Sequence, residues 1–126
     1  MLARSVLIIL GSINAITGII IVLAPRTFYE AIPGLDAMGP FSVHFIRDVG
    51  LVYFSGGLIL TAGGLFANWQ IALCGALWFF LHGLFHVQVW VHRGAPFDGV
   101  FWFDFAAVIF PSVLVFVAAL RLRASN

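Results

Sequence analysis

Four long apolar runs account for most of the chain, and short segments containing polar residues, glycine or proline separate them. A helix rises 1.5 Å per residue, so about 20 apolar residues cross the roughly 30 Å hydrocarbon core of a bilayer. Each run is long enough for this. The pattern predicts an all-α integral membrane protein, a single transmembrane domain over residues 1–126 with helices at about residues 5–24, 41–66, 69–91 and 99–120.

The connections between the runs predict how the helices are arranged. The second and third runs meet almost directly before Trp69, and only residues 92–98 join the third run to the fourth. Short connections make neighbouring helices antiparallel and keep them in contact, which predicts an up-down-up-down four-helix bundle. Pro25 should end the first helix. The long segment 26–40 that follows contains an amphipathic stretch, which we expect to lie at the membrane interface.

Composition excludes an ordinary soluble domain. The chain is 63% hydrophobic and only 9% charged, whereas soluble domains are about 25% charged. Its net charge of +1 includes no lysine, and the arginines are too scattered to predict a nucleic-acid partner. An even number of spans puts both termini on one side. Arg4, Arg121 and Arg123 there outnumber Arg26 and Arg93 opposite, so the positive-inside rule predicts cytoplasmic termini.

Small residues recur along the first two runs, where they would let helices approach closely in lipid. They are Gly11, Ser12, Ala15, Gly18, Gly56, Gly57, Gly63 and Gly64. A bundle this small often assembles further, so a second copy or another membrane protein is an expected partner besides the lipid bilayer. Cys74 is the chain's single cysteine and is expected to be a small buried apolar residue.

Ionisable residues inside the apolar runs are the strongest functional signal, because such residues are costly in a bilayer and usually face a protein interior. In the second run, His44, Arg47 and Asp48 share one helical face. In the third run, His82 and His86 are four residues apart. The helical rise places Arg47, Asp48, His86 and Asp104 at depths of about 7 to 10 Å from the outer end. His82 would lie deeper, level with Asn14, so the set predicts one polar column opening outward.

Several interpretations fit this column. The first is a divalent metal site for zinc, iron or manganese, with ligands from His82 and His86 and from one or two of His44, Asp48 and Asp104. Arg47 would then hold an anionic ligand or orient an acid, and Arg47, Asp104 and Asn14 are the candidates for contact with a bound cofactor. The second is structural: Arg47 pairs with Asp104 or Asp48, and neutral histidines hydrogen-bond to Asn14, Ser55 or the backbone.

Haem, quinone, lipid and proton-relay sites are further alternatives. His82 and His86 lie on one helix and cannot reach opposite faces of a porphyrin, so haem would need His44 as one axial ligand. A histidine beside a carboxylate is also suited to proton exchange near neutral pH.

The string His44-Phe-Ile-Arg47-Asp48-Val-Gly50, followed by His82-x-x-x-His86, resembles a group of small uncharacterised bacterial four-helix membrane proteins that are loosely DoxX-like. The likeness covers the second and third runs. In the related sequences an acid often follows the second histidine closely, whereas here the next acid is Asp98. The resemblance implies that the polar residues form a shared site, that the site has a redox-accessory role, and that the chain resides in a bacterial inner membrane.

Overall fold

The computed structural model describes residues 1–124, and every regular element within them is helical. Four helices in this range are long and apolar enough to cross a membrane, which confirms the prediction of four long apolar helices. The order is α1 (Leu2–Leu23), α2 (Pro25–Ala31), α3 (Leu35–Met38), α4 (Val43–Leu65), α5 (Trp69–His92), α6 (Gly99–Asp104), the π-helical segment η1 (Phe105–Ile109) and α7 (Phe110–Ala124). The last three form one continuous span, Gly99–Ala124.

The helix ends follow from local chemistry. Pro25 ends α1 at Leu23 and becomes the first residue of α2, as predicted. Asn68 caps α5 by accepting hydrogen bonds from the amides of Gln70 and Ile71 at 3.0 and 3.1 Å. Asp98 caps α6 in the same way, by accepting a hydrogen bond from the Phe101 amide. These caps explain why such short connections reverse the chain direction.

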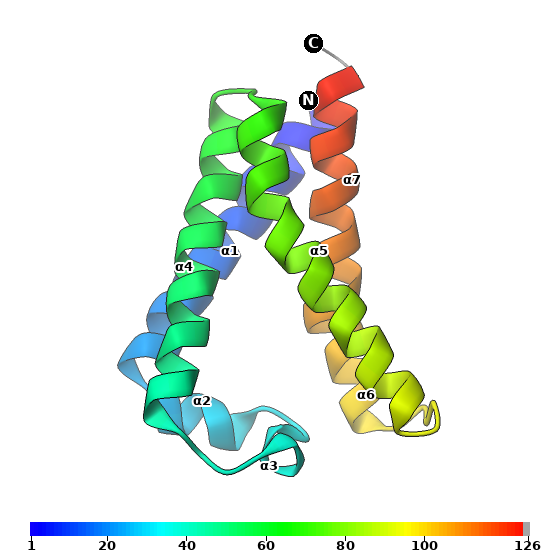
Figure 1. The fold of residues 1–126 in the computed structure, drawn as a ribbon. Coiled ribbons are helices and arrows are strands. Elements are labelled where there is room, and N and C mark those ends of the chain that lie inside the picture. Colours follow the sequence, from blue (N-terminus) through cyan, green and yellow to red (C-terminus); the bar gives the residue numbers. More distant parts are fainter. Residues whose placement is uncertain (125–126) are drawn as a thin grey trace.

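Close backbone contacts hold α1 against α4. A Cβ atom added at Gly18 would lie 2.3 Å from the amide nitrogen of Phe54, and one at Gly57 would lie 2.4 Å from that of Ala15. No side chain fits there, which confirms that small residues bring these two helices together. At the end of the molecule where both termini lie, α4 also meets α5, and a Cβ at Gly63 would lie 2.5 Å from the Ala72 nitrogen (Figure 1).

The helices are packed unevenly along their length. Near the termini they converge on an apolar core, and toward the other end α1 and α4 diverge from α5 and α6 (Figure 1). The core cluster consists of Leu7, Leu60, Ala72, Ala76, Phe79, Val115, Ala118, Ala119 and Leu122. Cys74 does not belong to this core but is exposed, so the expectation of a buried cysteine was wrong. In lipid an apolar thiol side chain gains nothing from facing inward.

The segment between α1 and α4 forms two short helices that lie across the open end. Tyr29 donates a hydrogen bond from its hydroxyl to the Gly39 carbonyl at 2.7 Å, and the Arg26 guanidinium lies 4.3 Å above the Phe41 ring. Gly34 has a φ of +78°, and a Cβ there would lie 3.0 Å from the Val100 side chain. The turn at Gly34 therefore rests against α6 and links the two diverging helix pairs.

Candidate functional site

A buried histidine and a buried aspartate from different helices face each other in the open half of the molecule. His86 Nδ1 of α5 lies 3.0 Å from Asp104 Oδ2 at the end of α6, and the two side chains are only 13% and 10% exposed. The imidazole ring is oriented so that Nδ1 does not point at the carboxylate. The two groups are therefore within ion-pair distance but do not form a hydrogen bond.

Aromatic rings continue from this pair along α5. The rings of His82 and His86 have centroids 4.6 Å apart, and His82 stacks on Trp78 at 4.7 Å with an angle of 13° between the planes. Tyr53 of α4 meets both Trp78 and His82 edge-on, at 5.2 and 6.1 Å. These contacts fix the plane of His82 and leave it beside His86.

A small cavity of about 10 Å³ lies next to His82, where the four long helices meet. Each of these helices contributes one polar residue to its wall: Asn14, Tyr53, His82 and Ser112. The remaining wall is apolar and consists of Phe79, Ala107, Val108, Pro111 and Val115. Asn14 therefore lies beside His82, at the depth that the helical rise predicted.

The π segment explains how α6 and α7 both present polar groups to α5. Asp104 and Ser112 are eight residues apart, which in a regular α-helix places them about 80° apart around the axis. The wide turn of η1 takes up about one extra residue and reduces this angle to about 20°. Pro111, which lacks an amide hydrogen, lies two residues after the end of η1. Gly83 then gives Ser112 room, because a Cβ there would lie 2.1 Å from the Ser112 hydroxyl oxygen.

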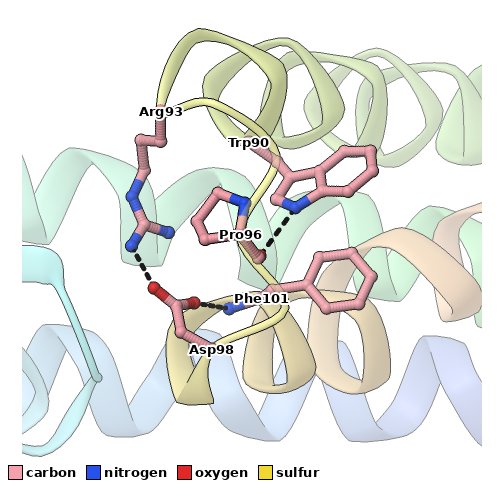
Figure 2. A network of polar contacts seen from close by, with 5 residues as sticks. All are labelled: Trp90, Arg93, Pro96, Asp98 and Phe101. Carbon is pink, nitrogen blue, oxygen red and sulfur yellow. Dashed lines mark hydrogen bonds and ion pairs between the residues drawn. The ribbon is translucent and has the colours of Figure 1, made fainter.

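The connection between α5 and α6 fixes the position of Asp104 relative to His86. Figure 2 shows that Trp90 donates its indole N–H to the Pro96 carbonyl at 2.9 Å. In the same connection, Asp98 forms an ion pair with the Arg93 guanidinium and accepts a hydrogen bond from the Phe101 amide at 2.9 Å. The amide of Phe101, followed by the guanidinium of Arg93, lowers the pKa of Asp98 below its usual value. His92 is the last residue of α5, and Arg93 is its C-cap.

A second polar group lies apart from the first, at the start of α4. His44 Nδ1 approaches Asp48 Oδ2 at 3.3 Å, but the two side chains are 87% and 58% exposed. Among residues 1–124, no group of three or more histidine, cysteine, aspartate or glutamate side chains is placed to hold a metal ion. The structure thus brings His82, His86, Asp104 and Asn14 together and leaves His44 and Asp48 as a separate surface pair.

Arg47 pairs with neither Asp48 nor Asp104 within the described chain, which corrects the structural interpretation of this residue. Its Nε atom donates to the Val22 carbonyl at 3.2 Å. Pro25 stops α1, so the last carbonyls of that helix lack helical donors, and a cation at a helix C-terminus also complements the helix dipole. Ser55 likewise bonds to its own helix, at the Leu51 carbonyl, and not to a histidine.

Tyr53, Trp78 and Ser112 belong to the site but were not predicted. Tyr53 and Trp78 are aromatic residues in a chain rich in aromatic residues, so their residue type alone did not indicate that they belong to a site. The one available signal for Ser112 was its place directly after Pro111, since a proline inside a helix displaces the backbone around it.

No match to the chain was found among protein-family models, curated proteins or solved structures.

Proposed function

We propose that this chain is an integral membrane protein that crosses the bilayer four times as an up-down-up-down bundle, and that His86, Asp104 and His82 form an acid–base site in its outward-facing half. The observation that carries the proposal is the approach of His86 to Asp104 at 3.0 Å with both side chains nearly buried. Ionisable residues at such depth are costly and usually functional.

The chemistry follows from the pairing. A carboxylate next to Nδ1 stabilises the imidazolium and holds the ring, which leaves Nε2 to take a proton from a bound molecule or return it. The apolar core around Leu7 and Leu60 closes the other half of the span. Protons would therefore enter and leave only at the end of the bundle where α2 and α3 lie. The site would serve a reaction at that end and would not conduct protons across the membrane.

The proposed orientation, family, location and role rest on the distribution of arginines and on the sequence motif. Arg4, Arg121 and Arg123 at the terminal end favour cytoplasmic termini, and the proposed site would then face outward. A DoxX-like relationship, a bacterial inner membrane and a redox-accessory role remain part of the proposal and rest on the motif resemblance. An acid–base site suits such a role, because redox reactions of organic carriers commonly take up or release protons.

Proton uptake tests the proposal directly. Protein in lipid nanodiscs is titrated from pH 8 to pH 5, the range in which histidine changes charge. His86→Gln should take up about one proton fewer than the wild type. His44→Gln is the control for loss of a histidine at an exposed position outside the pair of His86 and Asp104. Equal uptake by His86→Gln and the wild type would contradict an acid–base role.

A metal site is the second candidate. It is supported by two imidazoles with ring centroids 4.6 Å apart and a carboxylate beside one of them. As arranged, these side chains do not surround a common point, so no mechanistic step is assigned to a metal. Elemental analysis of protein purified without chelator or affinity-metal exposure decides the matter. About one equivalent of zinc, iron or manganese, lost in both His82→Ala and His86→Ala, would replace the acid–base proposal.

The structural alternative makes the opposite prediction for function. If the pair between His86 and Asp104 only fixes how α5 and α6 pack, an Asn–Gln pair of similar size should preserve the fold, and no proton uptake should be assignable to His86. The titration above therefore separates this alternative from the proposed function.

A further inference from the structure

The cavity at the meeting point of the four long helices has the size and polarity of a water site. Its volume of about 10 Å³ corresponds to roughly one water molecule on the scale on which buried waters are judged. Cavities of this size lined only by apolar groups stay dry, whereas polar walls with two to four partners hold water. Here Asn14, Tyr53, His82 and Ser112 supply four polar side chains.

The hydrogen bonds already present leave suitable groups for a water molecule. Asn14 donates from Nδ2 to the Leu10 carbonyl at 2.7 Å, so its side-chain oxygen remains as an acceptor. Ser112 donates to the Ile109 carbonyl at 2.7 Å, and its oxygen can also accept. Tyr53 and His82 make ring contacts but no hydrogen bonds to the described residues.

Burying polar groups without partners is unfavourable, and one water can satisfy several of them at once. A water in this cavity would accept hydrogen bonds from the Tyr53 hydroxyl and from an N–H of His82, and would donate to the side-chain oxygens of Asn14 and Ser112. No pair of protein side chains in the cavity makes these contacts directly. These four side chains together can supply the two donors and two acceptors that one water molecule pairs with.

We infer that this cavity binds a single water molecule that connects His82 to Tyr53, Asn14 and Ser112. The inference deepens the proposed function and rests on it, because the water would extend the site of His86 and Asp104 inward and bring the Tyr53 phenol into its hydrogen-bond network. The site would end there, since Phe79 and Val115 form its boundary with the apolar core.

Water-edited NMR on protein labelled with ¹³C-tyrosine tests the inference in lipid nanodiscs. The chain has only two tyrosines, so the spectrum is readily assigned with Tyr53→Phe. Tyr29, in the segment between α1 and α4, reports contact with bulk water. We expect polarisation transfer from water to both rings in the wild type, although Tyr53 lies inside a span.

Two variants should displace the water in different ways. Asn14→Leu replaces a polar wall by an apolar one of similar size, and Val108→Ile adds a methyl group while keeping every polar side chain. Both should abolish transfer to Tyr53 and leave transfer to Tyr29 unchanged. Val117→Ile is the matched control, because Val117 lies on α7 outside the cavity and is 40% exposed.

The outcomes separate this inference from the acid–base proposal. Absence of transfer to Tyr53 in the wild type, or transfer that persists in both Asn14→Leu and Val108→Ile, would overturn the water site. If His86→Gln shows normal proton uptake while transfer to Tyr53 is present and lost in both variants, the acid–base proposal fails and the water site stands.

Discussion

Among residues 1–124, two His–Asp pairs differ in environment far more than in distance. His86 and Asp104 come from α5 and α6, lie 3.0 Å apart and are nearly buried. His44 and Asp48 lie one turn apart on α4, at 3.3 Å, and are largely exposed. The second pair is a local helical contact, whereas the first depends on how two helices pack. The same chemical groups therefore have different consequences, because burial weakens screening and removes competing solvent.

Removal of the two acids should give the largest difference between the pairs. Asp104→Ala leaves His86 buried without its partner and should lower the free energy of unfolding by about 2 to 3 kcal/mol. Asp48→Ala should cost less than about 0.5 kcal/mol, because exposed pairs contribute little. Reversible unfolding in mixed micelles, followed by tryptophan fluorescence, measures both. Equal effects of the two substitutions would show that burial does not distinguish the pairs.

Double-mutant cycles sharpen the comparison by isolating each pairwise interaction. The coupling between His86→Ala and Asp104→Ala should be about 1 to 2 kcal/mol. The coupling between His44→Ala and Asp48→Ala should be about 0.3 to 0.5 kcal/mol, as for other i,i+4 pairs on a helix surface. The same unfolding assay supplies all the values. A coupling near zero at His86 and Asp104 would mean that the short distance contributes no specific stabilisation.

Salt should act on one pair only. At about 1 M ionic strength the Debye length falls to about 3 Å, which screens exposed charges but hardly affects buried ones. The coupling of His44 with Asp48 should disappear between low and high salt, while that of His86 with Asp104 should persist. Repeating the cycles at both salt concentrations measures this. Loss of both couplings would indicate that solvent reaches the buried pair.

Asp98 should show a smaller effect that depends on pH. Its pKa is lowered in the folded protein by the Phe101 amide and by Arg93, so the unfolded chain binds the proton more readily. The resulting stabilisation is complete above the unfolded pKa of about 3.8 and is lost as the pH falls through the folded pKa. In Asp98→Asn, the free energy of unfolding should not show this loss of stabilisation when unfolding is compared at neutral and acidic pH. An unchanged pH profile in the variant would contradict the assignment.

Much of the fold could be predicted because its signals are local. Pro25 ends α1, Asp98 caps α6, and Gly18 and Gly57 bring α1 against α4, each for a reason contained in a few neighbouring residues. Run lengths identified the four long apolar helices to within a few residues of their observed ends. Spans and caps of this kind need no knowledge of distant parts of the chain.

The arrangement of the site could be predicted only in part. Helical spacing correctly grouped His82 with His86 and placed Asn14 at the same depth, but it wrongly joined His44 and Asp48 to them. Spacing shows which residues share a face, not toward which helix that face turns. In lipid the outer surface is also apolar, so hydrophobicity does not mark the inside. Pro111 indicates a disturbed helix in this region, but no sequence pattern predicts the π segment that turns Asp104 toward α5.

The tautomer of His86 tests the central claim most directly, and ¹⁵N-histidine NMR at neutral pH in lipid nanodiscs measures it. If Asp104 orients His86 for proton exchange, the neutral ring should be held as the Nδ1–H tautomer in the wild type and should lose that preference in Asp104→Leu. His44 should show a mixture of tautomers that Asp104→Leu leaves unchanged. A tautomer mixture at His86 that matches His44, and that does not respond to Asp104→Leu, would contradict the account.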